Sequence, residues 1–314
     1  MNGLARLFAT AMLLISSAAS AQTWPERPIQ MVVPFGAGGT TDLMARILQE
    51  EMSKAVGGNI VVVNTAGAGG AIAMSQVARA RPDGYTIAMT AVGPQVVQPA
   101  RRNTGYTPDS FDYICGTYDA PVLTFVAADS PHRDLKSLVA WAKANPGKLA
   151  YGSPALGSVP HISMLQLLRE QGVDALHVPY KSSADMILPL KTGQILAIND
   201  SPAVGTQYQL RALLALADAP VPGYETTPTA KSLGLKTRAS IWGGIVAPKG
   251  LPADVRSKLE AACAKATATT IYRARAQAAH NPLVFRNGEQ FQKFAAAEHQ
   301  QFARTVKENQ LEDK

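Results

Sequence analysis

The stretch IQMVVPFGAGGTTDLMARILQE, residues 29–50, places three local signals side by side. Ile29–Pro34 is a short apolar run rich in β-branched residues, which predicts a buried strand. Phe35–Thr40 follows as a glycine-rich loop, and the residues after it show apolar side chains at helical spacing. A strand, a glycine loop and a helix in that order predict one unit of an α/β fold.

The same unit recurs along the chain. Ile60–Val63 predicts a second strand, residues 64–70 a second glycine-rich loop and Ala71–Ala80 a second helix. A third loop, 153–160, leads from the predicted strand Leu149–Gly152 into another helix. Continuous apolar strands between helices are typical of mainly parallel sheets covered on both faces. We predict further strands at 85–90, 121–127, 175–178, 194–198, 211–217 and 242–247, and only helices from Pro252 to the end.

The composition is that of a globular protein, with 314 residues of which 46% are hydrophobic and 17% charged. At roughly 150 residues per domain, this length predicts about two domains. The net charge is +7, but basic residues form no stripe interleaved with aromatic ones, so we exclude nucleic acid as a partner. We place the adjacent basic pair, Arg101 and Arg102, outside any binding cleft.

The first residues have the features of a secretory signal. Arg6 precedes the apolar run Leu7–Ile15, and Ala19-Ser20-Ala21 is a small-residue cleavage site. The apolar run is too short for a membrane-spanning helix. We therefore predict that residues 1–21 are removed and that the exported protein begins at Gln22, the alternative being an anchor left in place.

The cysteines and histidines give no sign of a metal or redox site. Export permits a disulfide between Cys115 and Cys263, yet they lie far apart in the sequence, so we predict two buried free thiols with a disulfide as the alternative. The five histidines lack metal-ligand spacing, so we predict no metal. The glycine loops miss the dinucleotide pattern G-x-G-x-x-G, because Thr41 and Ile72 stand where the last glycine is needed. We predict no cofactor.

Three loops that lead directly into helices, 35–41, 64–70 and 153–160, indicate a binding cleft. A helix N-terminus presents free N–H groups and the positive end of its dipole, so it binds anions without lysine or arginine. Ligands of open α/β sheets bind at the carboxyl ends of strands, where these loops lie. We predict that the three loops converge on an anion, the alternative being that they only connect strands to helices.

Three polar residues beside the expected cleft each have two possible roles. Asp42 follows the first loop and either lines the cleft or caps its helix. His161 follows the third loop and is either a ligand-lining or a hydrogen-bonded structural histidine. Asp200 ends a predicted strand and faces either the cleft or a turn. Ser158 is the expected cap of the helix after the third loop, with Pro160 in its first turn.

The chain resembles a known family through short motifs that occur in order from about residue 24 to 310. The family is that of the Bug-type extracytoplasmic solute receptors of tripartite tricarboxylate transporters. The matching motifs are Trp24-Pro25, Pro28-Ile29, Val32-Val33-Pro34-Phe35, Gly38-Gly39-Thr40, Asp42, Ala45-Arg46, Val62-Val63-Asn64, Gly67-Ala68-Gly69-Gly70, Pro82-Asp83-Gly84-Tyr85-Thr86, Tyr151-Gly152-Ser153, Gly157-Ser158, His161, Val178-Pro179-Tyr180-Lys181, Gly193-Gln194, Trp242, Ala247-Pro248 and Pro252.

The resemblance implies an α/β periplasmic binding protein of the type II-like, two-lobed kind. Lobe 1 is expected at 22–122 and 244–314 and lobe 2 at 123–243, with a hinge of two crossing strands near 121–127 and 241–247. Such a receptor is periplasmic, monomeric and free of cofactors. It clamps a small organic carboxylate between its lobes and delivers it to membrane transporter subunits.

The resemblance also implies where the ligand is held. The first and third loops hold a carboxylate through backbone amides and waters, and less regular positions contact its distal end. The segments Thr90–Val97 and Lys181–Ser183 depart from the usual family pattern, and the apolar character of the former suits a less polar, aromatic or longer-chain acid. The expected ligand-binding residues are Phe35, Ala37, Gly38, Gly39, Thr40, Asp42, Asn64, Val92, Gly93, Ser153, Leu156, Gly157, Ser158, His161, Tyr180, Asn199 and Asp200.

Two other functions stay open at the level of sequence. A secreted hydrolase would use Ser153 or Ser158 with His161, but the chain has no G-x-S-x-G elbow and no identifiable orienting carboxylate, so we predict no catalytic residues. A sensory binding protein without transport has the same sequence features as a transport receptor.

Overall fold

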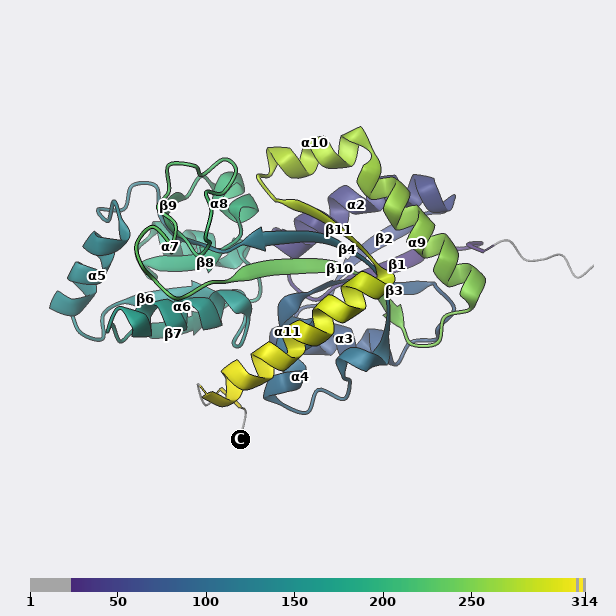
Figure 1. Cartoon of the computed structure of the whole chain (residues 1–314), viewed down its shortest axis with the longest axis horizontal. Coiled ribbons are helices and arrows are strands. Elements are labelled where there is room, and N and C mark those ends of the chain that lie inside the picture. The colour runs from purple at the N-terminus through teal and green to yellow at the C-terminus, as the bar shows by residue number, and fades with distance from the viewer. Residues whose placement is uncertain (1–23, 309–310, 313–314) are drawn as a thin grey trace, which may run out of the picture.

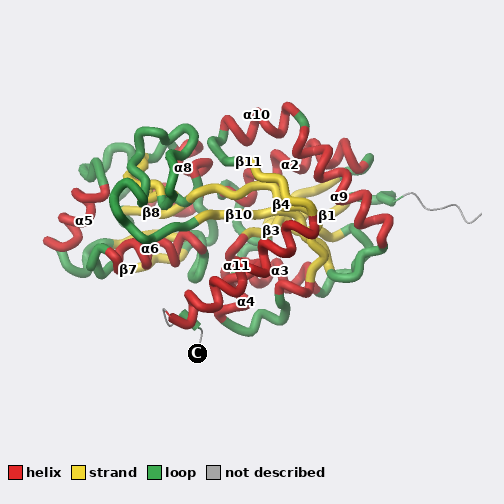
Figure 2. The backbone as a smooth tube through the Cα atoms, viewed as in Figure 1, coloured by secondary structure: helices red, strands yellow, loops and turns green. Residues whose placement is uncertain are grey.

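The structure is a computed structural model that describes residues 24–308 and 311–312. Two α/β lobes lie end to end along the long axis of the molecule, as Figures 1 and 2 show. The predicted signal sequence, residues 1–21, lies outside the described residues. Within the described part, no helix combines the length and the apolar composition needed to cross a membrane.

The first lobe is built on a six-stranded sheet with helices on both faces. Figure 1 shows α2, α9 and α10 on one side of this sheet and α3, α4 and α11 on the other. The strands in spatial order are β11 (Leu283–Asn287), β4 (Phe111–Pro121), β10 (Ser240–Pro248), β3 (Thr86–Ala91), β1 (Ile29–Val33) and β2 (Ile60–Asn64). The helices are α2 (Thr40–Val56), α3 (Ala71–Ala78), α4 (Gln98–Arg101), α9 (Ala253–Ala268), α10 (Thr270–Ala278) and α11 (Gly288–Glu308).

The second lobe has a five-stranded sheet and four helices. Its strands in spatial order are β7 (Leu176–Pro179), β6 (Ala150–Ser153), β8 (Ala197–Asp200), β5 (Leu123–Val126) and β9 (Arg211–Ala215). Its helices are α5 (Leu135–Ala144), α6 (Val159–Glu170), α7 (Ile187–Lys191) and α8 (Pro202–Tyr208). Single 3-10 turns occur at Ala68–Gly70, Pro108–Ser110 and Ala184–Met186, and a π-helical turn at Gly93–Val97.

The two-lobed α/β architecture is confirmed, but each sheet is mixed rather than mainly parallel. The pairs β1–β2, β1–β3, β6–β7 and β6–β8 are parallel, whereas β10 and β5 pair antiparallel with both of their neighbours. The antiparallel strands flank the two connections between the lobes. The parallel part of each sheet carries the loops that lead into α2 and α6, as expected for strand–loop–helix units.

The chain crosses between the lobes twice, and the two crossings are hydrogen-bonded neighbours. The β4 strand ends at Pro121, opposite Ser240 at the start of β10. The N–H of Val122 donates to the carbonyl oxygen of Ala239 at 2.9 Å. Figure 1 shows β4 and β10 extending together toward the second lobe. These positions agree with the predicted crossing strands, while the predicted boundary between residues 243 and 244 falls inside β10.

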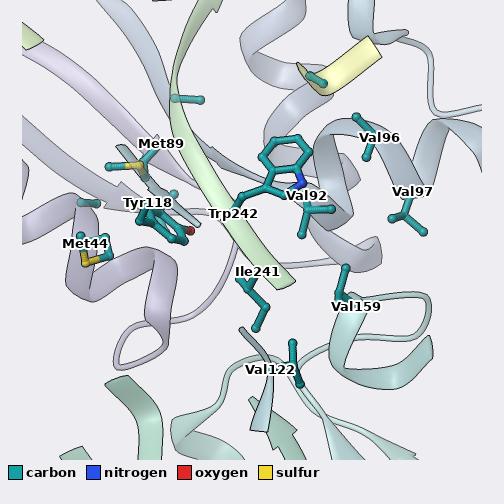
Figure 3. Packing of buried hydrophobic residues seen from close by; sticks show 14 of the residues in the cluster. Met44, Met89, Val92, Val96, Val97, Tyr118, Val122, Val159, Ile241 and Trp242 are labelled. Carbon is teal, nitrogen blue, oxygen red and sulfur yellow. The ribbon is translucent and has the colours of Figure 1, made fainter. Parts of the chain in front are cut away.

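A single apolar cluster extends from the first sheet into the second lobe. Trp242 on β10 is fully buried, and the rings of Phe291 and Phe294 pack edge-on against it, with centroids 5.7 and 5.3 Å away. Figure 3 shows Val92, Val122, Val159 and Ile241 gathered where the lobes meet. The base of the site is therefore packed as a core rather than as a loose surface contact.

The predicted free thiols are wrong, because Cys115 and Cys263 form a disulfide. Cys115 lies on β4 and Cys263 on α9, which packs over that strand, and their Cα atoms are 6.6 Å apart. Sequence spacing gives no information about a distance that depends on how a helix packs against a sheet.

The prediction that only helices follow Pro252 is also wrong, because β11 adds to the edge of the first sheet. Its pairing with β4 is irregular between Leu283 and Arg286. Its side chains alternate between exposed and half-buried, and Leu283 and Phe285 are among the exposed ones. A five-residue edge strand without a buried face lacks the apolar pattern by which strands are recognised in sequence.

Candidate functional site

A small cavity of about 40 Å³ lies between the lobes, at the carboxyl ends of the parallel strands. This volume is room for a few water molecules. Among its lining residues, Asp200 alone is charged, and they include no lysine or arginine. They are Phe35, Gly39, Thr40, Thr41, Ala91, Val92, Gly93, Pro154, Ser158, Val159, Pro160, Ser183, Asp200 and Ile241.

The first loop brings the N-terminus of α2 to this cavity. Gly39 is the N-cap residue in an extended conformation, and it has no side chain that could accept hydrogen bonds from the first turn. Thr40 and Thr41 begin the helix and line the cavity. Because the unpaired N–H groups of a first turn carry the positive end of the helix dipole, this end of α2 favours a negatively charged ligand.

Asp42 supports the first loop rather than lining the cavity. Its carboxylate accepts hydrogen bonds from the N–H of Gly38 at 3.0 Å, from Asn64 Nδ2 at 2.9 Å and from Arg46 Nε at 3.1 Å. Burial alone would raise the pKa of Asp42, but the hydrogen bonds, chiefly the one from Arg46, outweigh it and hold the pKa below its usual value. Asn64 also donates to the carbonyl oxygen of Phe35 at 3.0 Å. Asp42 and Asn64 therefore fix the shape of the loop.

The third loop brings the N-terminus of α6 to the opposite side of the cavity. Ser158 is the N-cap, as predicted, and its Oγ accepts a hydrogen bond from the N–H of His161 at 3.3 Å. Pro160 occupies the first turn, where a missing N–H costs nothing. Pro154, Val159 and Pro160 give this side of the cavity an apolar surface beside the helix dipole.

His161 stands behind the third loop in a cluster of rings. Its Nδ1 accepts a hydrogen bond from the N–H of Gly157 at 3.1 Å. Its ring is parallel to that of Tyr151, with centroids 6.3 Å apart, and tilted against that of His177, with centroids 4.0 Å apart. Burial, together with the charges of His177 and Arg101, lowers the pKa of His161 to about 3. Burial lowers the pKa of His177 to about 4. Both imidazoles are neutral at pH 7, and the contacts of His161 are those of a hydrogen-bonded histidine behind the third loop.

On one side of the cavity, the lobes are joined through Asp200. Thr40 Oγ1 of the first lobe donates to Asp200 Oδ1 at 3.2 Å and lies 2.6 Å from Ser201 Oγ. Ser183 Oγ donates to Asp200 Oδ2 at 2.6 Å. Burial raises the pKa of Asp200 to about 6, against the lowering effect of its hydrogen bonds. Nearby, the hydroxyl of Tyr208 donates to the carbonyl oxygen of Gly38 at 2.9 Å.

On the other side, the lobes are joined through Arg101. Its Nη1 donates to the carbonyl oxygen of Leu156 in the third loop at 3.3 Å, and its Nε to that of Leu311 at 2.8 Å. Gln98 Nε2 also donates to Leu156, at 3.0 Å. Arg101 does not line the cavity, in agreement with its predicted place outside the cleft, but it is buried against the third loop. Arg102 donates to the carbonyl oxygen of Ala68 in the second loop.

The structure brings seven of the seventeen expected residues to the cavity. They are Phe35, Gly39, Thr40, Val92, Gly93, Ser158 and Asp200. The other expected residues lie behind the loops or beside them, and their roles as ligand contacts stay predictions. They are Ala37, Gly38, Asp42, Asn64, Ser153, Leu156, Gly157, His161, Tyr180 and Asn199.

The second loop does not reach the cavity, so the predicted convergence holds for two of the three loops. Gly70 packs instead against Pro94 and Pro34. Sequence reasoning missed Ser183 and Ile241, which come from a loop and from a crossing strand that only the packing of the lobes brings in. The departure from the family pattern at Lys181–Ser183 was the available signal for Ser183.

The described residues offer no metal site, since they hold no group of three potential metal-binding side chains. Ser153 Oγ lies 2.8 Å from His177 Nε2, so its imidazole partner is His177 and not the expected His161. Ser153 also donates to the carbonyl oxygen of Ala155 and lies outside the cavity. This serine therefore holds the end of β6 and the third loop together.

Two α/β lobes that enclose a cavity between helix N-termini define the class of two-lobed solute-binding proteins. A sequence profile of one family in this class, described as the tripartite tricarboxylate transporter family receptor, matches residues 44–311. The chain belongs to this family. Since it is a family of receptors, the chain is not an enzyme, and the hydrolase alternative falls.

Known relatives match over most of their length. A UPF0065 protein in the gbd 5′ region of Cupriavidus necator is 34% identical over 282 residues, which cover 88% of this chain and 86% of the relative. Protein BugT of Bordetella pertussis is 34% identical over 249 residues, with 75% of each chain covered.

Solved structures share the whole fold. The periplasmic binding protein BugD superposes with a TM-score of 0.88 at 32% identity, covering 93% of this chain and 100% of BugD. MatC from Rhodopseudomonas palustris, solved with malate, gives 0.84 at 28% identity, covering 90% and 100%. A second R. palustris protein, solved with adipate, gives 0.85 at 28% identity, covering 90% and 97%.

Proposed function

We propose that this receptor captures a small organic carboxylate between its lobes in the periplasm and delivers it to the membrane subunits of a tripartite transporter. The observation that carries the proposal is the pair of helix N-termini, of α2 and α6, that face one cavity whose lining residues include no basic side chain. Such a site neutralises an anion with N–H groups, dipoles and hydroxyls.

The related structures support a carboxylate as the ligand. Two proteins with the same fold hold malate and adipate, both dicarboxylates. In this chain Phe35, Val92, Pro154 and Ile241 give the cavity apolar walls between the two helix ends. Apolar walls between polar ends suit an acid with a hydrocarbon segment, of the longer-chain or aromatic kind.

Capture requires the lobes to move apart, because the cavity is smaller than the pockets of about 300–1,000 Å³ that usually hold small molecules. The crossings at Val122 and Ala239 are the points about which the lobes rotate. The contacts of Thr40 with Asp200 and of Arg101 with Leu156 re-form around the ligand on closure. A monomer is sufficient for this cycle.

The test is a thermal-shift screen of the mature protein against malate, adipate, hexanoate and benzoate, each paired with its amide or methyl ester. A bound acid at a hundred times its Kd raises the melting temperature by about 5 °C. We expect the acids to stabilise the protein and their uncharged partners to have no effect. Equal shifts from an acid and its amide would contradict carboxylate recognition.

A further inference from the structure

Asp200 stands out because it is a fully buried carboxylate in the cavity expected to receive an anion. Three donors satisfy it: Ser183 Oγ on Oδ2, and Thr40 Oγ1 and the N–H of Ser201 on Oδ1. Within the described chain, no lysine or arginine forms an ion pair with it. A buried carboxylate without a cation is costly unless it is hydrogen-bonded or protonated.

One acceptor position of this carboxylate is left over. A carboxylate offers about four lone-pair sites, and three of them are used. The remaining site is on Oδ2, which accepts only from Ser183 among the described residues. Because Asp200 lines the cavity, a proton on Oδ2 can donate directly to a ligand oxygen there.

Among the described residues that line the cavity with Asp200, none is a cation that could offset a second negative charge. Tyr118 on β4 and Tyr208 on α8 face it, and its charge raises the pKa of both beyond the effect of burial. Asp42 on α2 and Asp185 beside Ser183 add further negative charge near Tyr208. His161, on the helix that packs against β8, directs its ring to Tyr151 and His177 instead.

We propose that Asp200 couples ligand capture to proton uptake, binding one proton on Oδ2 as a carboxylate enters the cavity. The proton comes from the solvent, an O–H bond forms on Asp200, and no bond of the ligand is made or broken. Two carboxylates confined in a low-dielectric site share a proton more readily than they coexist as two charges. This inference rests on the proposed function, because it requires an anionic ligand.

The first test is on the wild-type protein, with adipate and malate as probes at pH values where both acids are fully ionised. Since burial raises the pKa of free Asp200 to about 6, the ionised form predominates above that pH. Binding that requires a proton then weakens about tenfold per pH unit, or about thirtyfold between pH 7.0 and 8.5. Isothermal titration in buffers of different ionisation enthalpy should show uptake of close to one proton per ligand.

The second test assigns the proton to Asp200. In Asp200→Asn the amide oxygen can still accept the hydrogen bonds from the N–H of Ser201 and from Thr40 Oγ1. The NH₂ group takes the place of Oδ2 and donates permanently where the proton would be. We expect this variant to bind with no pH dependence and no proton uptake. The matched control is Asp185→Asn, which removes an exposed carboxylate of the adjoining loop and should retain the wild-type pH dependence.

The outcomes separate the two proposals. A wild-type protein that binds adipate or malate with constant affinity from pH 7.0 to 8.5, and without proton uptake, overturns the coupling but leaves carboxylate capture standing. If the ligand affinity of Asp200→Asn still depends on pH as in the wild type, the assignment of the proton to Asp200 is overturned. A protein that binds no acid of the panel at pH 6 or pH 8 contradicts the proposed function, and the coupling falls with it.

Discussion

The Nη1 atom of Arg101 lies 3.3 Å from the carbonyl oxygen of Leu156, so a cation of the first lobe holds the third loop of the second. Arg101 is not among the residues that line the cavity. Its Nε also donates to the carbonyl oxygen of Leu311 at 2.8 Å. A basic residue of the first lobe therefore holds a loop of the cavity without lining the cavity itself.

Replacement of Arg101 by alanine should weaken both binding and the fold. Hydrogen bonds from charged groups contribute about 1.5–3 kcal/mol each when buried, so we expect urea denaturation to show a loss of about 2 kcal/mol. Isothermal titration should show an affinity about tenfold lower, since the contact spans the lobes. Arg81→Ala, whose side chain is 84% exposed, is the control and should change neither value. Wild-type affinity in Arg101→Ala would show that the third loop holds its position alone.

Gly157→Ala should destabilise the protein for two reasons that can be separated. The backbone of Gly157 has φ +72°, and a Cβ there would collide with the side chain of Arg101. Gly147 has the same φ but open space around it, so Gly147→Ala measures the backbone strain alone, about 1–2 kcal/mol. We expect a larger loss of unfolding free energy in Gly157→Ala, and recovery of the excess in the double variant with Arg101→Ala. Equal losses at the two glycines would contradict the collision.

Gly39→Val should obstruct the site without straining the backbone. Gly39 has φ −97°, a value that residues with a Cβ adopt without strain, and a Cβ would lie 3.3 Å from Ser183 Oγ. The two valine methyls must then enter the cavity or displace Ser183 from Asp200. We expect a loss of at least about 2 kcal/mol in binding, roughly thirtyfold, with an unchanged far-ultraviolet spectrum. Gly39→Ala is the graded control, and full affinity in the valine variant would remove the first loop from the site.

The buried histidines should make the protein less stable as the pH falls from 7 to 5. The pKa of His161 is about 3 in the folded state and near 6.5 in the unfolded state, so the unfolded state alone takes up the proton in this window. The resulting loss is on the order of 2 kcal/mol at pH 5. Asp200 acts in the opposite direction, because its pKa is raised on folding. The measurement is therefore the difference in urea stability between wild type and His161→Asn, which should narrow from pH 7 to pH 5.

Ligand binding should make the protein more compact. The cavity is too small to admit a dicarboxylate unless the lobes separate about the crossings at Val122 and Ala239. Small-angle scattering should show a smaller radius of gyration at saturation than in the free protein. An unchanged radius with a ligand that titration shows to be bound would contradict hinge closure.

Sequence patterns predicted the strands that are continuous apolar runs in the sequence. The strands at Ile29–Val33 and Ile60–Asn64 and the helix cap at Ser158 were found because their signals are local. The strand Leu283–Asn287 was missed because its edge position leaves it without a buried face. The share of parallel strand pairs was overestimated. The crossing strands are also continuous apolar runs, but they pair antiparallel with their neighbours.

The site was predictable where a loop adjoins its own helix and unpredictable where the lobes meet. Gly39, Thr40 and Ser158 line the cavity as a direct consequence of strand–loop–helix order. Ser183 and Ile241 reach the same cavity only through the packing of one lobe on the other. Asp42 and His161 do not line the cavity, because each accepts a hydrogen bond from its own loop. The order of elements in the sequence does not tell which way such a side chain turns.

The position of β10 has a consequence for the order in which the protein is made. This strand lies in the middle of the first sheet, between β3 and β4, yet residues 122–239 separate it from β4 in the sequence. As the chain emerges from its N-terminus onward, the second lobe is complete before β10 appears. The first sheet gains its central strand only when residues 240–248 are made, because this strand pairs with Thr86–Ala91 on one side and with Phe111–Pro121 on the other. The lobe that begins the protein is therefore the lobe that finishes folding last.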